Sequence, residues 1–571
     1  MGTILTLYDW FIVIIFILLI SLVTTLPDLY SLFKNKKKWV PVNFPPYLNG
    51  DEYHFFSLLN FIHRRFLNLF YRYNLSYPKL HAASKFQLFG FIFNLPAYHL
   101  GFLLGDRRYG VLFVRFWNSI CLGISFFLLF YAIVNLMGIE RDMLILAFSS
   151  YIAYIIFYPG LFRVKSIILN IKKNDFMYKH DDANDLFRAM FSGTSAPLFL
   201  ASSALLIYAH SINYSDIVIQ IAVILPTIIL FFVYLPISIV YSLAVILSSL
   251  ISYNWLVLFV TLIILILLMI LYIYKVNQDE VGKELFAHTD GGIIFSINPR
   301  LILRVGVIIA PCFLVTYYLF YKQYLFLGLF TLLMGVFSLT YFLKKHQLSR
   351  FYDRGSCILL QALIVIVFMI FIDNTIASLL LGIFLFGLLV YFFYNQALFL
   401  YKNYSTTSAD FINNRIDFSS FFNKSKKNSV IIATDSPVIS GLIDVFGSDE
   451  PLLRQYTLQP YGYKKHLDKI CKNFIILNYS LEEIIKIFCK NVKKTEYMVN
   501  RPFKKSDLSS EDCCYQWSIQ FIICSGEYNN QIIQDKMYDN INGWSKNYKD
   551  MISQKFKAIS SDDVKANVSV V

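Results

Sequence analysis

The sequence has little charge for its length. Only 15% of the 571 residues are charged and 57% are hydrophobic, with a mean hydropathy of +0.55, whereas soluble domains carry about 25% charged residues. Between Ala189 and Tyr274 the only formal charge is Asp216. A soluble fold cannot bury so long an apolar run, but successive membrane spans of about 20 residues would use all of it. The composition therefore predicts an integral membrane protein.

Several motifs of soluble and ATP-driven proteins are missing. The sequence has no P-loop, GxGxxG, nucleophile elbow or HExxH, which argues against an ATP-driven pump. Its eight cysteines form no CxxC pattern for a metal. The net charge of +14 comes from loops and the C-terminal tail, where basic residues meet lipid head groups or phosphate-bearing substrates. We therefore expect membrane lipids, and no nucleic acid, among the partners.

Apolar segments predict the membrane spans. The first, from about residue 10 to 26, follows no basic segment and precedes no cleavage site, so it is interpreted as a retained helix. An interrupted apolar stretch at 80–104 is expected to lie in the membrane interface. The region 216–274 allows three spans, or two with kinks at Pro226 and Pro236. With the first helix, spans at 111–136, 143–161, 190–211, 216–234, 236–252, 254–274, 299–321, 323–343, 356–372 and 376–400 give a total of about 11.

The predicted fold class is a polytopic α-helical membrane protein with a small C-terminal α/β domain. Residues 1–401 form the membrane domain, and the tail, 402–571, contains strand–helix patterns such as NSVIIATDSPVISGLIDVFG. Three polar regions interrupt the membrane domain, and we expect them and the tail to be exoplasmic. They are 31–104, with interfacial helices, 162–188 and 275–300.

The sharpest candidate for chemistry is the acidic pair Asp51 and Glu52, which begins an amphipathic helix predicted over about 51–73. One interpretation is helix capping, because free backbone N–H groups at a helix N-terminus stabilise carboxylates. The other is functional. A carboxylate at a membrane-surface cavity can take a proton from an acceptor, or hold a divalent metal against a phosphate.

This region is similar to a known group of membrane enzymes. A first helix is followed by a loop with an Asp-Glu pair, an apolar interfacial helix after Tyr77-Pro78, and a helix entered through Arg115 in VLFVRFWNS. This order resembles the GT-C superfamily of integral membrane glycosyltransferases, particularly the branch of protein O-mannosyltransferases and lipid A aminoarabinose transferases. The resemblance extends through NDLFRAMFSGTSAPLFLASSAL, to about residue 210, and is only architectural beyond it.

The resemblance implies an inverting glycosyltransferase that uses a polyprenyl-phosphate sugar. It implies that Asp51 acts as the general base or binds the metal, a divalent cation such as Mg²⁺ or Mn²⁺, with Glu52 in support. His54 can share the face of Asp51, although a lone interfacial His is more often structural. Arg115 is implied as a substrate contact.

Guanidinium groups near the membrane surface suit a donor phosphate, because they stay charged and bind two oxygens at once. Arg188, Arg300 and Arg304 are the candidates, with a snorkelling anchor as the alternative for Arg188. His288 and Asp290 lie in AHTDGGIIFSINPR, a loop that in the resembling enzymes orders over the lipid-linked donor.

Two rival functions differ from this expectation. One is a secondary transporter or an exporter of lipid or polysaccharide, although such proteins place ionisable residues inside spans. The other is a non-catalytic scaffold of the same fold. The acceptor is left open as lipid, glycan or protein, and the expected location is a bacterial inner membrane, with the site facing the periplasm or exterior. That orientation conflicts with the basic run Lys36–Lys38, which the positive-inside rule assigns to the cytoplasm.

Overall fold

The computed structural model describes residues 6–35, 88–138, 195–278 and 312–338, and single positions at 56, 59, 60, 62, 63, 359, 363, 376, 380 and 383. Every regular element in these ranges is a helix. The helices are α1 (Leu7–Asn35), α4 (Leu88–Leu104), α5 (Arg107–Met137), α9 (Ser195–Ser211), α10 (Ile217–Phe231), α11 (Leu235–Ile251), α12 (Trp255–Gln278), a helix at Cys312–Tyr321 and α15 (Leu325–Ser338).

The chain divides into two compact units. Unit 1 consists of Met1–Tyr47, Phe86–Tyr274 and Thr289–Asn413, and it contains the helices above except the last residues of α12. Unit 2 consists of Leu48–Lys85, Lys275–His288 and Asn414–Val571. The predicted α/β tail domain lies outside the described residues.

The helices agree with the predicted spans where both can be compared. Two of them, α5 and the stretch Trp255–Lys275 of α12, are long and apolar enough to cross a membrane, and seven further apolar helices are shorter. The region 216–274 forms three helices, because Pro236 starts α11 and Tyr253, with φ of 53°, reverses the chain before α12. The first helix continues beyond the predicted end at residue 26, since its polar last turns stay helical.

Helix α12 exposes an apolar surface along its length. Trp255, Phe259, Ile263 and Ile270 are all more than half exposed. An apolar exposed surface of this size is rare in a soluble monomer and suits contact with lipid. The large exposed side chains of α12 are Trp255, Leu256, Phe259, Ile263, Ile266, Leu267, Ile270, Leu271, Ile273 and Tyr274.

Hydroxyl side chains in the apolar helices bond to backbone carbonyls. In the α10–α11 hairpin, Ser238 Oγ donates to Thr227 O at 2.8 Å and Tyr241 OH donates to Val223 O at 2.8 Å. These bonds join the two helices beside the kink at Pro226, and such contacts hold helices together where lipid offers no hydrogen bonds. Other hydroxyls bond to the carbonyl four residues back in their own helix, namely Ser21, Thr25, Ser119, Ser125, Ser202, Ser203, Ser242, Ser249 and Thr331.

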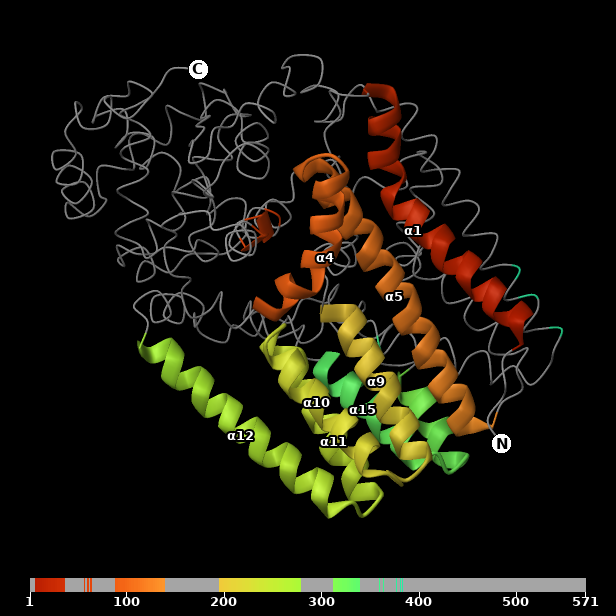
Figure 1. Ribbon diagram of the computed structural model, residues 1–571. Coiled ribbons are helices and arrows are strands. Elements are labelled where there is room, and N and C mark those ends of the chain that lie inside the picture. The colour runs from red at the N-terminus through yellow and green to blue at the C-terminus, as the bar shows by residue number, and fades with distance from the viewer. Residues whose placement is uncertain are drawn as a thin grey trace, which may run out of the picture. The chain divides into compact units, whose positions relative to one another are not determined.

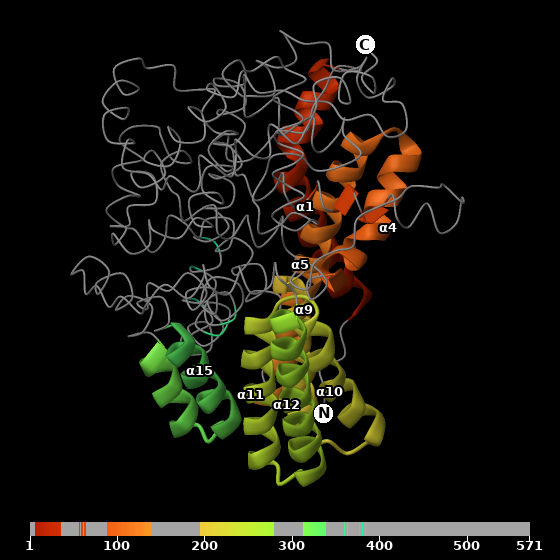
Figure 2. The ribbon, with the colours of Figure 1, turned by 90° about the vertical axis from the view of Figure 1, so that its left-hand side faces the viewer.

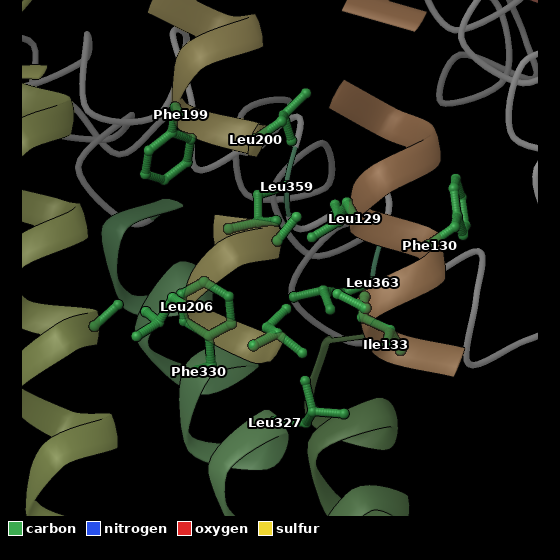
Figure 3. Packing of buried hydrophobic residues seen from close by; sticks show 14 of the residues in the cluster. Leu129, Phe130, Ile133, Phe199, Leu200, Leu206, Leu327, Phe330, Leu359 and Leu363 are labelled. Carbon is green, nitrogen blue, oxygen red and sulfur yellow. The ribbon is translucent and has the colours of Figure 1, made fainter. Parts of the chain in front are cut away.

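The core of unit 1 lies between α5, α9 and α15. Figure 3 shows large side chains from the three helices meeting there, with two leucines between them. The contributing residues are Leu129 and Ile133 of α5, Phe199, Leu200 and Leu206 of α9, Leu327 and Phe330 of α15, and Leu359 and Leu363, while Phe130 belongs to the same cluster from the other side of α5. All are buried.

Helices α1 and α5 pack antiparallel. A Cβ added at Gly123 would meet Ile17 Cγ1 at 3.1 Å, and the ring of Trp10 lies 5.3 Å from that of Phe127. The last turns of α1 therefore lie toward the start of α5, as Figure 1 also shows.

Short turns join the helices at the other end of α5. Tyr324 OH, just before α15, donates to Met137 O at 3.0 Å, and the ring of His210 in the last turn of α9 lies 4.2 Å from that of Phe326. His210 Nδ1 also lies 3.0 Å from Ser248 Oγ of α11. We call this the short-turn end; it lies toward the bottom of Figures 1 and 2.

The opposite end of unit 1 is where α1 ends and α5 begins. The rings of Phe231 in α10 and Tyr272 in α12 lie 6.2 Å apart, so α12 ends beside the end of α10, away from the short turns. We call this the long-connection end. It contains the last turns of α1 and the first turn of α5, whereas the 17-residue α9 begins about halfway along the 31-residue α5.

Helix α4 packs closely against the first half of α5. A Cβ at Gly101 would meet the backbone oxygen of Tyr109, and would lie 2.7 Å from the nitrogen of Gly110. Farther along, the rings of Phe93 and Trp117 lie 5.7 Å apart. The predicted interfacial segment 80–104 thus contains a helix that folds back on the next span.

In unit 2, the described positions agree with the predicted amphipathic helix at 51–73. Residues 56, 59, 60, 62 and 63 are helical and buried. Their spacing of three and four residues places them on one face of a helix.

Gly101 provides a test of the hairpin. Gly101→Ala should lower the temperature at which half of the purified protein loses its monodisperse elution, because the new methyl group meets rigid backbone, at a cost of about 1–3 kcal/mol. Gly123→Ala is the milder comparison, since its methyl group would meet side-chain atoms of Ile17, at 3.1 Å or more, and no backbone atom. Equal melting of both variants would contradict the close approach of α4 and α5.

Candidate functional site

Of the side chains predicted for the site, Arg115 is the one that the structure describes. It lies in the first half of α5 and is 3% exposed. The other candidates lie outside the described residues, and their roles stay predictions. These are Asp51, Glu52, His54, Arg188, His288, Asp290, Arg300 and Arg304.

Arg115 lies level with a hydroxyl-bearing part of α1. Ile17 of α1 contacts Gly123 of α5. Because the helices are antiparallel, Thr25, about two turns after Ile17, lies level with Arg115, about two turns before Gly123. Thr25 is buried, and its hydroxyl donates to Ser21 O at 2.8 Å. The described neighbourhood of this guanidinium is therefore partly polar, although it is enclosed.

The sequence analysis missed an ion pair at the first turn of α5. Asp106 caps this helix, because its carboxylate accepts from the backbone N–H of Arg108 at 2.8 Å. The same carboxylate accepts from Nε of Arg108 at 2.9 Å and from Nη2 at 2.6 Å. The side chain of Arg108 is 8% exposed and that of Asp106 is 25% exposed. The signal was Gly105-Asp106 before a span, a common helix-start pattern.

Arg108 and Arg115 lie on the same flank of α5. They are seven residues apart, which is close to two helical turns, and both are buried. Burying a guanidinium group costs free energy because the charge loses its water. Both groups lie toward the long-connection end and away from the middle of the bundle, which lowers this cost.

Two asparagines complete the polar groups of this region. Asn118 is 1% exposed, and neither its Oδ1 nor its Nδ2 has a hydrogen-bond partner among the described residues. Asn94 of α4 is fully buried; its Nδ2 donates to Gly90 O at 2.9 Å, and its Oδ1 has no partner in the described part of the chain. The sequence analysis described 80–104 only as an interrupted apolar stretch and did not single out Asn94.

A separate polar cluster lies at the short-turn end. Ser248 Oγ lies 3.0 Å from His210 Nδ1 and accepts a 2.6 Å hydrogen bond from Tyr214 OH, while Ser252 Oγ lies 3.0 Å from the same His210 nitrogen. Burial raises the pKa of Tyr214 to about 12, against the lowering effect of its hydrogen bond to Ser248. The phenol therefore stays neutral at ordinary pH and donates. These bonds join α9 to α11, which is a structural role.

The described residues contain no group of three or more His, Cys, Asp or Glu side chains that could hold a metal ion. The residue predicted to bind a divalent cation, Asp51, lies outside them. The expectation of Mg²⁺ or Mn²⁺ therefore stays a prediction.

Comparison with known proteins adds no identification. No family model, curated protein or solved structure matches the chain. Within the described ranges, the fold is helical and includes two helices long and apolar enough to cross a membrane.

The ion pair of α5 leads to an asymmetric prediction. Asp106→Asn keeps a good helix cap but removes the charge that pairs with the buried Arg108 at 2.6 Å, so it should destabilise the protein by about 1–3 kcal/mol. Arg108→Met should cost less, because the more exposed Asp106 carboxylate can be solvated. Thermal melting of both variants in one detergent tests this. The double variant should recover part of the loss, and an Arg108→Met protein that melts below Asp106→Asn would contradict the assignment.

Proposed function

We propose that this chain is an integral membrane glycosyltransferase that moves a sugar from a polyprenyl-phosphate donor to an acceptor at the outer face of the membrane. The single observation that carries the proposal is the common direction of three helix termini that border the candidate segments. The segment with Asp51 and Glu52 follows the last turn of α1, and the segment with His288 and Asp290 follows α12. Arg188 precedes the first residue of α9, Ser195. All three helix termini point away from the short-turn end.

Chain length limits how far Arg188 can be from this end. Arg188 precedes Ser195 by seven residues (195 − 188), and seven residues reach at most about 25 Å. The common direction of the three helix termini is what supports the proposal.

The proposed reaction is one displacement at the anomeric carbon. An acceptor hydroxyl or amine attacks that carbon, and its proton passes to the Asp51 carboxylate, with Glu52 and His54 nearby. The bond from the anomeric carbon to the phosphate oxygen breaks, and the polyprenyl phosphate leaves with the electron pair. A single displacement inverts the anomeric centre.

The leaving phosphate needs cationic stabilisation, which we assign to Arg188, Arg300 and Arg304. A divalent cation at Asp51 would supply further positive charge. His288 and Asp290 belong to a loop that would close over the donor. Arg115 is buried on α5, so it would contact the substrate only from the side of the helix bundle.

The charge distribution favours this proposal over a transporter. In α9 to α12, the charged side chains that the structure describes are Asp216, at the start of α10, and Lys275, in the last turn of α12. A transporter places ionisable groups near the middle of its spans. Charges at helix ends suit chemistry at the membrane surface.

Asp51→Asn tests the proposed base. The purified protein, reconstituted in liposomes with polyprenyl-phosphate sugars and an envelope extract as acceptor, should release free polyprenyl phosphate. Asp51→Asn should reduce this release by about 100-fold or more, which is the scale of general-base catalysis. Asp216→Asn is the control, because Asp216 only caps α10, where Asn caps equally well. Normal release by Asp51→Asn would remove Asp51 from the mechanism.

The orientation can be tested independently. Alkaline phosphatase inserted after Lys38 in the full chain should be active in a bacterial host, because the long-connection end is proposed to face the exterior. The same insertion after Gly138, at the short-turn end, should be inactive. The reverse pattern would agree with the positive-inside rule and would contradict an outward-facing site.

A further inference from the structure

Two enclosed amides in the α4–α5 hairpin have hydrogen-bonding groups without partners among the described residues. They are both polar atoms of Asn118 and the Oδ1 of Asn94. Native proteins rarely leave buried polar groups unpaired, and each such group costs about 1–3 kcal/mol. Each therefore calls for a physical explanation.

The packing of the hairpin places the two amides near each other. Phe93 of α4 and Trp117 of α5 are in contact, and each asparagine directly follows one of these rings. When two antiparallel helices face each other through one residue each, the next residue of each helix points to the same side of the pair. Asn94 and Asn118 thus lie at the same level and on the same side, while Trp117 remains 38% exposed on the other.

The unpaired atoms define the chemistry of a matching ligand. They are two carbonyl oxygens, which accept, and one amide nitrogen, which donates. An anion only accepts, so it would leave both oxygens unpaired and would repel them. A hydroxyl group donates and accepts at once. Neighbouring hydroxyls, as on a sugar ring, can match both side chains.

We propose that Asn94 and Asn118 form a subsite for the hydroxyl groups of a saccharide. Asn118 lies one helical turn deeper in the bundle than Arg115, about 4.5 Å along α5. The saccharide identity rests on the proposed function, in which a sugar is transferred at this end. The same hydroxyl chemistry can come from the donor sugar or from a glycan acceptor.

Binding in lipid nanodiscs tests this subsite without requiring transfer. The probes are polyprenyl-phosphate hexoses and pentoses, with unglycosylated polyprenyl phosphate as the reference. Asn118→Leu and Asn94→Leu should weaken binding of the glycosylated lipid that the wild type binds best by about tenfold, with the reference changed less than twofold. If the leucine variant does not fold, Asn118→Ser, a smaller change, should also weaken binding of the glycosylated lipid.

The matched control is Thr261→Val. Thr261 in α12 is also buried with a hydroxyl that has no partner in the described residues, so its loss removes the same kind of group elsewhere. The Thr261→Val variant should bind every probe as the wild type does. If this control also lost sugar binding, the effect would be one of general packing, and the subsite would be rejected.

Two measurements distinguish whether the bound sugar belongs to the donor or to a glycan acceptor. Weaker binding of the glycosylated lipid assigns the subsite to the donor. Unchanged donor binding, with a tenfold higher acceptor concentration for half-maximal transfer, assigns it to the acceptor. If neither changes, or if the wild type binds no glycosylated lipid and no glycan, the amides are paired by water and the proposal is overturned.

The outcome for Asp51 is separate. Loss of sugar binding in the Asn118 variants, together with normal transfer by Asp51→Asn, would keep the subsite and reject the proposed base. Unchanged donor binding and an unchanged acceptor concentration for half-maximal transfer in the Asn118 variants, together with lost transfer by Asp51→Asn, would keep the base and reject the subsite.

Discussion

The packing of α5 against three other helices is the constraint on which the rest of unit 1 depends. α1 lies against it through Ile17 and Gly123, α4 through Gly101 and Gly110, and α9 through the core of Figure 3. An apolar helix can be enclosed in this way only if its backbone is satisfied internally, which the helix does by itself. Glycine at the closest approach lets α4 and α5 come nearer than any side chain would permit. The position of every polar group in the hairpin follows from this approach.

The position of each polar side chain in unit 1 follows from the free energy that its burial costs. Hydroxyl groups such as those of Ser238 and Tyr241 are tolerated within the bundle, because a backbone carbonyl accepts from each. The guanidinium of Arg108 lies at a helix start, where Asp106 pairs with it. Some buried polar groups have no partner among the described residues: the hydroxyls of Thr227, Thr261 and Thr316, and the amides of the two asparagines, which carry three such atoms within one hairpin. A departure from an otherwise consistent pattern is the kind of feature that marks ligand contacts.

Much of the helical architecture could be predicted because hydrophobicity and helix signals are local. The segments 190–211, 216–234, 236–252 and 254–274 were each identified as apolar runs, and each contains one helix. The alternative of two long helices in 216–274 failed, because the chain reverses at Tyr253 with a positive φ. That conformation carries little sequence signal when the residue is not glycine. The end of α1 was placed too early for a related reason, since polar residues beyond the apolar core can remain helical.

The sequence alone determined that the chain is apolar, helical through 195–278 and equipped with charged segments between its apolar runs. These properties depend on neighbouring residues and on transfer free energies, which need no tertiary information. Tertiary structure decided which helix ends share one side of the bundle and which side chains share one level. Asn94 and Asn118 are 24 residues apart (118 − 94), and only the folding of α4 back onto α5 brings them to the same level. Contacts between distant residues arise from packing, so no local pattern could have indicated this pair.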